Sequence, residues 1–320
     1  MKINRLSLSR TIAALLFFAA GAACAQGPQI LRLVVPFAPG SYTDNVARLI
    51  APGLSERLGK NVIIENRAGA NGIIGADHVA RAKPDGLTLL VGGASVNTVN
   101  PSVYKSLPYD PVNDLVPIAR IGLLPFVLVV NPQIPVHTVP ELIAYAKTHL
   151  KELSYGTPNA TTLVAMETFK RRAGIDILSV PYKSSPQATT DLIGNQVQVL
   201  MADFATAMPQ VEAGKARLLA VTMGKRSPLL PGVPSMSETI EGFDVSAWTG
   251  LLAPANTPPD AVHDVFEALR ASLATPELQA KLKSIGFDVQ PLGPDEFGPY
   301  LRSEIDTWRK LTREAGIEPQ

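Results

Sequence analysis

The chain has 320 residues, with 29 lysines and arginines against 28 aspartates and glutamates, and one cysteine. This balanced charge gives no electrostatic footprint for binding nucleic acid or an anionic membrane surface, and one cysteine excludes a disulfide within the chain. After the N-terminal segment, no apolar run approaches the ~20 residues that span a bilayer, because proline and polar residues interrupt each one. We therefore expect a globular protein that is free in solution.

The N-terminal segment is typical of an export signal. It begins with positive charge, residues 11–23 are almost all apolar, and Ala23-Cys24-Ala25 fits a small-x-small cleavage site. We expect residues 1–25 to be a signal peptide whose removal takes away three basic residues and leaves 26 basic and 28 acidic ones. The alternative is a lipoprotein anchored at Cys24, but that signal requires a branched apolar residue where this chain has Gly21.

The first third of the chain repeats a strand, a loop and a helix. Short apolar runs predict strands at residues 31–35, 61–65 and 87–92, and apolar spacing predicts helices at residues 44–58 and 74–82. Pro52 lies inside the first helix, where a kink or an early end is expected. Such repeated units form a parallel sheet with its loops gathered at one edge. Residues 100–119 have weak periodicity and are interpreted as a connecting segment.

A second series of strands and helices begins at residue 126. Strands are predicted at residues 126–130, 153–156, 177–182, 197–202 and 218–223, with helices at residues 139–149, 163–172 and 186–193. A last strand at residues 246–254 precedes helices at 259–274, 276–285 and 294–315 with no strands of their own. Because such helices must pack on an existing sheet, we expect the first lobe to be discontinuous and to comprise residues 26–125 plus 249–320. The second lobe, residues 126–248, is inserted into it. The chain crosses between the lobes twice, which predicts a two-strand hinge.

Motifs for metal binding and nucleophilic catalysis are missing. The four histidines, His78, His137, His149 and His263, are scattered, and no His-Glu-x-x-His, Cys-x-x-Cys or calcium loop occurs. Ser95 lacks the final glycine of a hydrolase nucleophile motif, and the glycines at 69, 72 and 75 have the wrong spacing for a dinucleotide loop. We expect no metal, no cofactor and no enzymatic activity; the alternative is an exported hydrolase that uses Ser95 or Asp203.

Polar loops follow two of the predicted strands. In residues 36–43 the backbone amides of Ser41, Tyr42 and Thr43 precede a helix without carbonyl partners, and residues 157–162 repeat this arrangement. Such loops either form an anion-binding site at the edge of the sheet or are ordinary strand-to-helix turns. Because these loops carry little charge, we favour the interpretation that they form a cleft that binds a small polar or anionic solute without changing it.

Several motifs, in order along the chain, carry a resemblance to a known family. They are Pro36-Phe37-Ala38-Pro39-Gly40-x-x-Thr43-Asp44, Glu65-Asn66-Arg67-x-Gly69-Ala70-x-Gly72, Lys83-Pro84-Asp85-Gly86, Leu107-Pro108-Tyr109-Asp110-Pro111, Val180-Pro181-Tyr182-Lys183 and Gly250-Leu251-Leu252-Ala253-Pro254. With them the chain resembles the tripartite tricarboxylate transporter solute-binding proteins, or Bug receptors. The resemblance implies an α/β periplasmic binding protein type II fold, with two lobes and a ligand cleft. It also implies a monomeric periplasmic protein that delivers a small carboxylate, aromatic acid or amide to membrane permease subunits; a sensor role is the alternative.

The resemblance also implies the binding residues. In the first lobe they are Phe37, Ala38, Ser41, Tyr42, Thr43, Asp44, Ser95 and Asn97, and in the second Thr157, Asn159, Thr161, Thr162, Tyr182 and Asp203. The chain departs from the family at Tyr42, where a small residue is usual, so its phenol either stacks on the ligand or narrows the pocket. This departure favours an aromatic or less charged ligand. Asp203 either accepts a bond from a ligand ammonium or amide, or only caps a helix.

Overall fold

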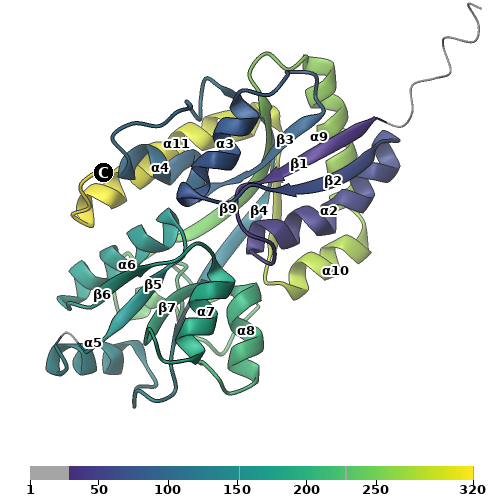
Figure 1. Ribbon diagram of the computed structural model, residues 1–320. Coiled ribbons are helices and arrows are strands. Elements are labelled where there is room, and N and C mark those ends of the chain that lie inside the picture. The colour runs from purple at the N-terminus through teal and green to yellow at the C-terminus, as the bar shows by residue number, and fades with distance from the viewer. Residues whose placement is uncertain (1–28, 151, 228, 320) are drawn as a thin grey trace, which may run out of the picture.

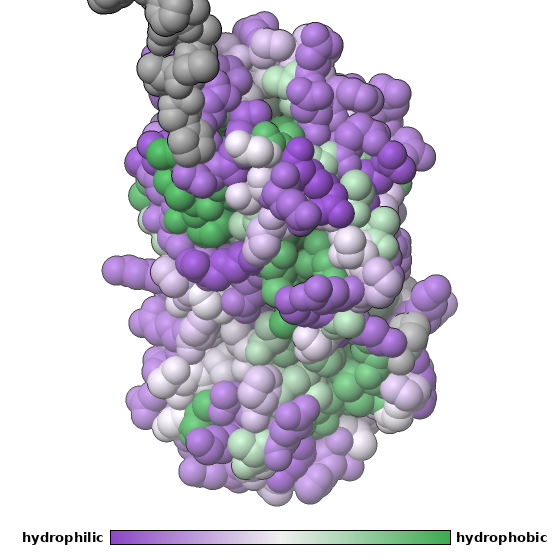
Figure 2. All heavy atoms as spheres, turned by 90° about the vertical axis from the view of Figure 1, so that its right-hand side faces the viewer, coloured by the Kyte–Doolittle hydropathy of each residue, from purple (hydrophilic) through white to green (hydrophobic). Residues whose placement is uncertain are grey.

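The structure is a computed structural model that describes residues 29–150, 152–227 and 229–319 (Figure 1). The signal peptide expected at residues 1–25, including Cys24, lies outside the described residues. Within these residues no helix is both long and apolar enough to cross a bilayer. Figure 2 shows polar side chains over much of one face, with separate apolar areas between them.

One end of the molecule is built on three parallel strands, as the strand and helix repeats predicted. They are β1 (Ile30–Val35), β2 (Asn61–Asn66) and β3 (Thr88–Gly93), with β1 between the other two. Leu31 and Leu33 on β1 are fully buried, because helices cover the sheet. β9 (Ser246–Pro254) adds antiparallel to β3. The parallel order gathers the carboxyl ends of β1 and β3 at one edge.

The longest strand, β4 (Leu115–Val130), joins the two ends of the molecule. It pairs with β9 from Leu115 to Pro125, and from Phe126 it pairs with β7 (Val199–Asp203) and β8 (Arg217–Val221). The expectation of a connecting segment up to residue 119 was therefore wrong. Prolines and register shifts hide the strand pattern in its first half, where pairing with β9 supplies the structure.

The other end of the molecule carries a second sheet. β5 (Ser154–Thr157) lies parallel to both β6 (Leu178–Pro181) and β7. Its helices are α5 (Val139–Thr148), α6 (Ala160–Ala173), α7 (Ser185–Ile193) and α8 (Phe204–Glu212). α8 was not predicted from the sequence, and it continues through Pro209. Figure 1 shows these elements grouped below β1–β3, with β4 and β9 running between the two groups, so the two-lobed α/β fold is confirmed.

The remaining elements cover the first sheet or belong to it. They are α2 (Tyr42–Leu58), η2 (Ala70–Gly72), α3 (Ile73–Ala80), η3 (Ser95–Val99), α4 (Asn100–Val103), α9 (Pro259–Leu273), α10 (Pro276–Ser284), β10 (Asp288–Leu292) and α11 (Pro294–Glu314). A further short 3₁₀ helix is η4 (Met236–Glu238). One expectation was wrong here, because β10 is a strand after residue 254, antiparallel to β4. Residues 95–99 form the π-helix η3.

Helix α2 does not end early at Pro52. Gly53 explains why the helix persists, because it lets α2 approach α9 so closely that a Cβ at this position would lie 2.5 Å from Oγ of Ser272. Packing along this contact offsets the hydrogen bond that proline cannot donate.

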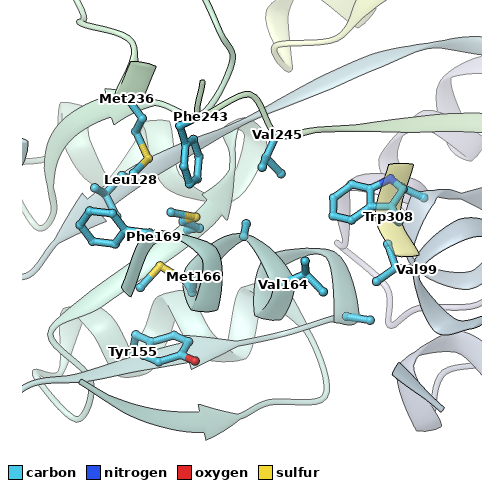
Figure 3. Packing of buried hydrophobic residues seen from close by; sticks show 14 of the residues in the cluster. Val99, Leu128, Tyr155, Val164, Met166, Phe169, Met236, Phe243, Val245 and Trp308 are labelled. Atoms are coloured by element: carbon cyan, nitrogen blue, oxygen red, sulfur yellow. The ribbon is translucent and has the colours of Figure 1, made fainter. Parts of the chain in front are cut away.

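Buried apolar residues also connect the two ends of the molecule. Val99 on η3, Val164 on α6 and Trp308 on α11 belong to one buried cluster. Figure 3 shows Trp308 and Val99 near Val164 at one end of α6, with Met166 and Phe169 farther along the same helix. The lobes therefore meet through apolar packing on one side of β4 and β9.

Candidate ligand-binding cleft

A pocket lies where the two lobes meet; it is partly open to solvent and has a cavity volume of about 50 Å³. Its walls follow the carboxyl ends of β1, β3, β5, β6 and β7, the middle of β4 and the start of β9. Eight of the fourteen predicted residues line it: Phe37, Ser41, Tyr42, Thr43, Ser95, Asn159, Thr161 and Asp203. The two polar loops singled out in the sequence therefore face one space, although more than 100 positions separate them.

Four helices begin at this pocket, and their N-cap residues all line it. The caps are Ser41 on α2, Asn159 on α6, Ser184 on α7 and Asp203 on α8. Each side chain accepts a bond from its own first turn; Asn159 Oδ1, for example, accepts the Thr162 amide at 3.0 Å. Converging helix N-termini create a positive potential and offer free amides, so the pocket favours an anionic group.

Four polar atoms in the pocket wall are buried without a hydrogen-bond partner among the described residues. They are the hydroxyl oxygens of Tyr42, Ser95 and Thr161 and the indole nitrogen of Trp248. An unsatisfied buried group costs about 1–3 kcal/mol. Two of the four come from the first lobe, one from the second and one from β9, so a single small ligand in the pocket could satisfy groups on both sides.

Asp203 is the only acidic residue in the pocket wall, and no lysine, arginine or histidine of the described chain lines it. Burial raises the pKa of Asp203, and hydrogen bonds from Ser185 and Thr206 oppose that rise. Burial also raises the pKa of Tyr42, to which the charges of Asp203 and Asp288 add. The phenol therefore stays protonated at neutral pH and is available as a donor.

Ala38, Asp44 and Asn97 of the first lobe were predicted to bind the ligand but lie outside the pocket wall. The Ala38 carbonyl accepts the Ser41 amide at 3.1 Å, which closes the turn before α2. Asn97 is fully buried, and its Oδ1 accepts the Gly93 amide at 3.1 Å. These residues shape the turn before α2 and the start of η3, which carry Ser41 and Ser95.

Thr157, Thr162 and Tyr182 of the second lobe also lie outside the pocket wall. The Thr157 hydroxyl donates to the Val180 carbonyl at 3.2 Å, and the Tyr182 hydroxyl donates to Asp191 at 2.9 Å. The Thr162 hydroxyl bonds back within the first turn of α6. Since each hydroxyl already has a partner in the chain, any role of these residues in binding stays a prediction.

Ten lining residues were not predicted. They are Gly93, Ala94, Leu124, Phe126, Pro158, Ser184, Ser185, Ala247, Trp248 and Thr249. Ser184 and Ser185 carried a signal, because serine before a helix is the same N-cap pattern as Ser41. The lining residues of β4 and β9 carried no such signal, because buried positions that face a pocket have the same sequence pattern as buried positions in the hydrophobic core.

Asp44 holds the first polar loop in place. Its carboxylate accepts bonds from the Gly40 amide at 2.9 Å, from Arg48 at 2.8 and 3.0 Å and from Asn66 at 2.9 Å. Burial alone would raise the pKa of Asp44, but these hydrogen bonds lower it below its ordinary value. Arg48 makes the largest of these hydrogen-bond contributions, but it is half exposed, so solvent weakens its charge.

We therefore expect the variant D44N to lower the free energy of unfolding by about 1–3 kcal/mol at pH 7, because the amide cannot accept all four bonds. Because the pKa of Asp44 is lower in the folded protein than the value of about 4 in the unfolded chain, the ionised carboxylate stabilises the fold at pH values above about 4. This stabilisation is lost as the pH falls through the pKa of the folded state. Urea unfolding at pH 7 and pH 3 should show the difference between wild type and variant narrowing at pH 3. An equal or wider difference at pH 3 would contradict this account.

The two lobes, the two connecting strands and the pocket with its four helix N-termini define a solute-binding protein of the periplasmic binding fold. Residues 46–317 match the model of the tripartite tricarboxylate transporter family receptor. The chain belongs to this family.

Individual relatives agree with the family match. The chain is 32% identical to BugT of Bordetella pertussis over 292 residues, which cover 90% of each protein. It superimposes on Rpa4515 of R. palustris with adipate at a TM-score of 0.89 and 35% identity, covering 92% of this chain and 100% of the other. MatC of Rhodopseudomonas palustris with bound malate gives a TM-score of 0.84 and 30% identity, with 88% and 98% covered.

Proposed function

We propose that this protein captures a small carboxylate outside the cytoplasm and delivers it to the membrane subunits of a tripartite tricarboxylate transporter. The observation that carries the proposal is the convergence of four helix N-termini and four unpaired polar groups on one pocket between the lobes. The family match and the similar structures with adipate and malate support it. We assign residues 26–125 plus 249–320 to one lobe and residues 126–248 to the other, and the protein acts as a monomer.

A carboxylate fits this pocket without any cationic side chain. It accepts hydrogen bonds from the first turns of α2 and α6, which belong to different lobes, so binding favours the closed arrangement about β4 and β9. Four or five charge-assisted hydrogen bonds of about 1.5–3 kcal/mol each, less the cost of ordering, are compatible with micromolar affinity, about −8 kcal/mol.

The pocket wall supports capture and not turnover. Among the described residues of the wall, no histidine or lysine lies beside Ser95, and the hydroxyl of Ser185 donates to the one carboxylate there, Asp203. A nucleophile needs a base within hydrogen-bond reach, so the bound solute should leave unchanged.

A ligand screen tests this function. We expect at least one compound among malate, adipate, citrate, benzoate and 4-aminobenzoate to raise the melting temperature, by roughly 5–10 °C at a concentration of about 100 Kd. Mass spectrometry of solute released from the purified protein should find a carboxylate, recovered intact after incubation. A released solute without a carboxyl group, or one that the protein converts, would contradict the proposal.

A further inference from the structure

Tyr42 is the first residue of α2, and its side chain lines the pocket. In an α-helix every Cα–Cβ bond tilts toward the helix N-terminus, so this side chain is directed into the space that the free amides of the first turn also face. The side chain is buried, and its hydroxyl oxygen has no hydrogen-bond partner among the described residues. The phenol therefore stands beside the place where a ligand carboxylate would bind α2.

Packing behind the Tyr42 ring holds it in the wall. Its centroid lies 5.6 Å from the centroid of the Phe287 ring, with the two planes tilted by 38°. Phe287 is itself buried against β4, where a Cβ at Gly122 would lie 2.7 Å from its Cε1. Both rings belong to one buried cluster of the first lobe. Because close-packed interiors leave little free volume, the Tyr42 ring has no space behind it into which it could withdraw.

The pocket itself is small. Its cavity volume is about 50 Å³, whereas a protein cavity that binds benzene has a volume of about 150 Å³. The rings of Phe37, Phe126 and Trp248 also line the wall, so aromatic side chains already fill much of the space between the lobes. Two roles were open for the Tyr42 phenol, stacking on the ligand and narrowing the pocket. The volume favours narrowing, because a ligand ring stacked on the phenol needs space that the pocket lacks.

Building on the proposed function, we propose that Tyr42 is a specificity-determining residue whose ring limits the length of the carboxylate that the pocket accepts. A carboxylate bound at the N-terminus of α2 begins beside this ring. Each carbon that the ligand adds must then fit between the ring and the second lobe. A short chain fits there, and a longer chain meets a ring that its packing on Phe287 holds in place. Tyr42 acts here through its volume, so its hydroxyl is not needed for the selection.

Matched pairs of ligands test this proposal by isothermal titration. The pairs are succinate with adipate and propionate with pentanoate, since the members of each pair differ only by two methylene groups. In each pair that binds, the wild-type protein should bind the shorter member about tenfold or more tightly. Y42A should abolish or reverse that preference, because it removes the ring. Y42F should keep the wild-type preference, because it removes only the hydroxyl.

Tyr104 provides the matched control, because it lies outside the pocket wall and its hydroxyl accepts a bond from Asn71 at 2.6 Å. The variant Y104A should keep the wild-type ratio of affinities.

Three results would overturn the inference while the proposed function stands. They are equal affinities for the short and long members in the wild-type protein, an unchanged ratio in a folded Y42A protein, and a ratio lost in Y42F as it is in Y42A. If no carboxylate binds to any of these proteins, both the inference and the proposed function fail. Should Y42A not fold, Y42L gives the same readout, because leucine keeps an apolar contact with Phe287 but is shorter than the ring.

Discussion

Removing two hydroxyl groups from the pocket, in the double variant S95A/T161V, is expected to weaken carboxylate binding by about a hundredfold or more. Both hydroxyls are buried in the wall and lack partners among the described residues, and they come from different lobes. A hydrogen bond to a charged group contributes about 1.5–3 kcal/mol, and each 1.4 kcal/mol is a factor of about ten in affinity. Isothermal titration with the ligand found in the screen measures the loss.

Thr189 on α7 gives a matched control for that experiment. Its hydroxyl is also buried and has no partner in the described part of the chain, but it lies outside the pocket. T189V should therefore leave the affinity within about twofold of wild type and hold or raise the stability, because it removes an unsatisfied group. An S95A/T161V protein that folds and binds as tightly as wild type would show that these hydroxyls do not face the ligand.

The second large effect is expected at Trp248, where W248A should lower the free energy of unfolding by about 3–5 kcal/mol. The indole is 1% exposed on β9, between the lobes. It packs edge-to-face on Phe297 at 5.2 Å between ring centroids and on Tyr300 at 6.3 Å. Urea denaturation monitored by far-UV circular dichroism measures the loss.

The conservative variant W248F separates packing from hydrogen bonding at this position. A phenyl ring keeps most of the contact with Phe297, so we expect it to restore much of the stability that W248A loses. It has no N–H group, so it should stay weaker than wild type in ligand binding if the indole nitrogen donates to the ligand. A stability loss below about 1 kcal/mol in W248A would contradict the packing seen around β9.

Trp248 also shows how the pocket depends on the connecting strands. Leu124 and Phe126 on β4 and Ala247, Trp248 and Thr249 on β9 form its floor, at the point where β4 changes its partner from β9 to β7. A rotation about these strands would move the helix N-termini of the two lobes toward or away from the floor. The residues that connect the lobes thus take part in the wall that the ligand contacts.

The sequence by itself determined the class of fold and much of the pocket's chemistry. Alternating apolar runs and polar loops predicted the parallel strands β1, β2 and β3, and β9 was predicted with the bounds that it has. The polar loops that carry Ser41 and Asn159 were identified because a polar segment between a strand and a helix is a local pattern, and both residues prove to be N-caps. A side chain that bonds the amide three positions later leaves its mark within a few residues of sequence.

Only the tertiary structure decided which of those residues share the pocket. Pairing with β9 organises the first half of β4 despite its prolines, and pairing with β4 makes β10 a strand. Asn97 and Tyr182 have the right chemistry for binding, but Asn97 Oδ1 accepts the Gly93 amide, the Tyr182 hydroxyl donates to Asp191, and neither residue lines the pocket. The residues next to Trp248 in the sequence do not reveal that it lines the pocket. A position buried against a distant helix and a position in a pocket wall favour the same residue types. Local bonds can be inferred from neighbouring residues, whereas a wall built from both lobes exists only after the chain has folded.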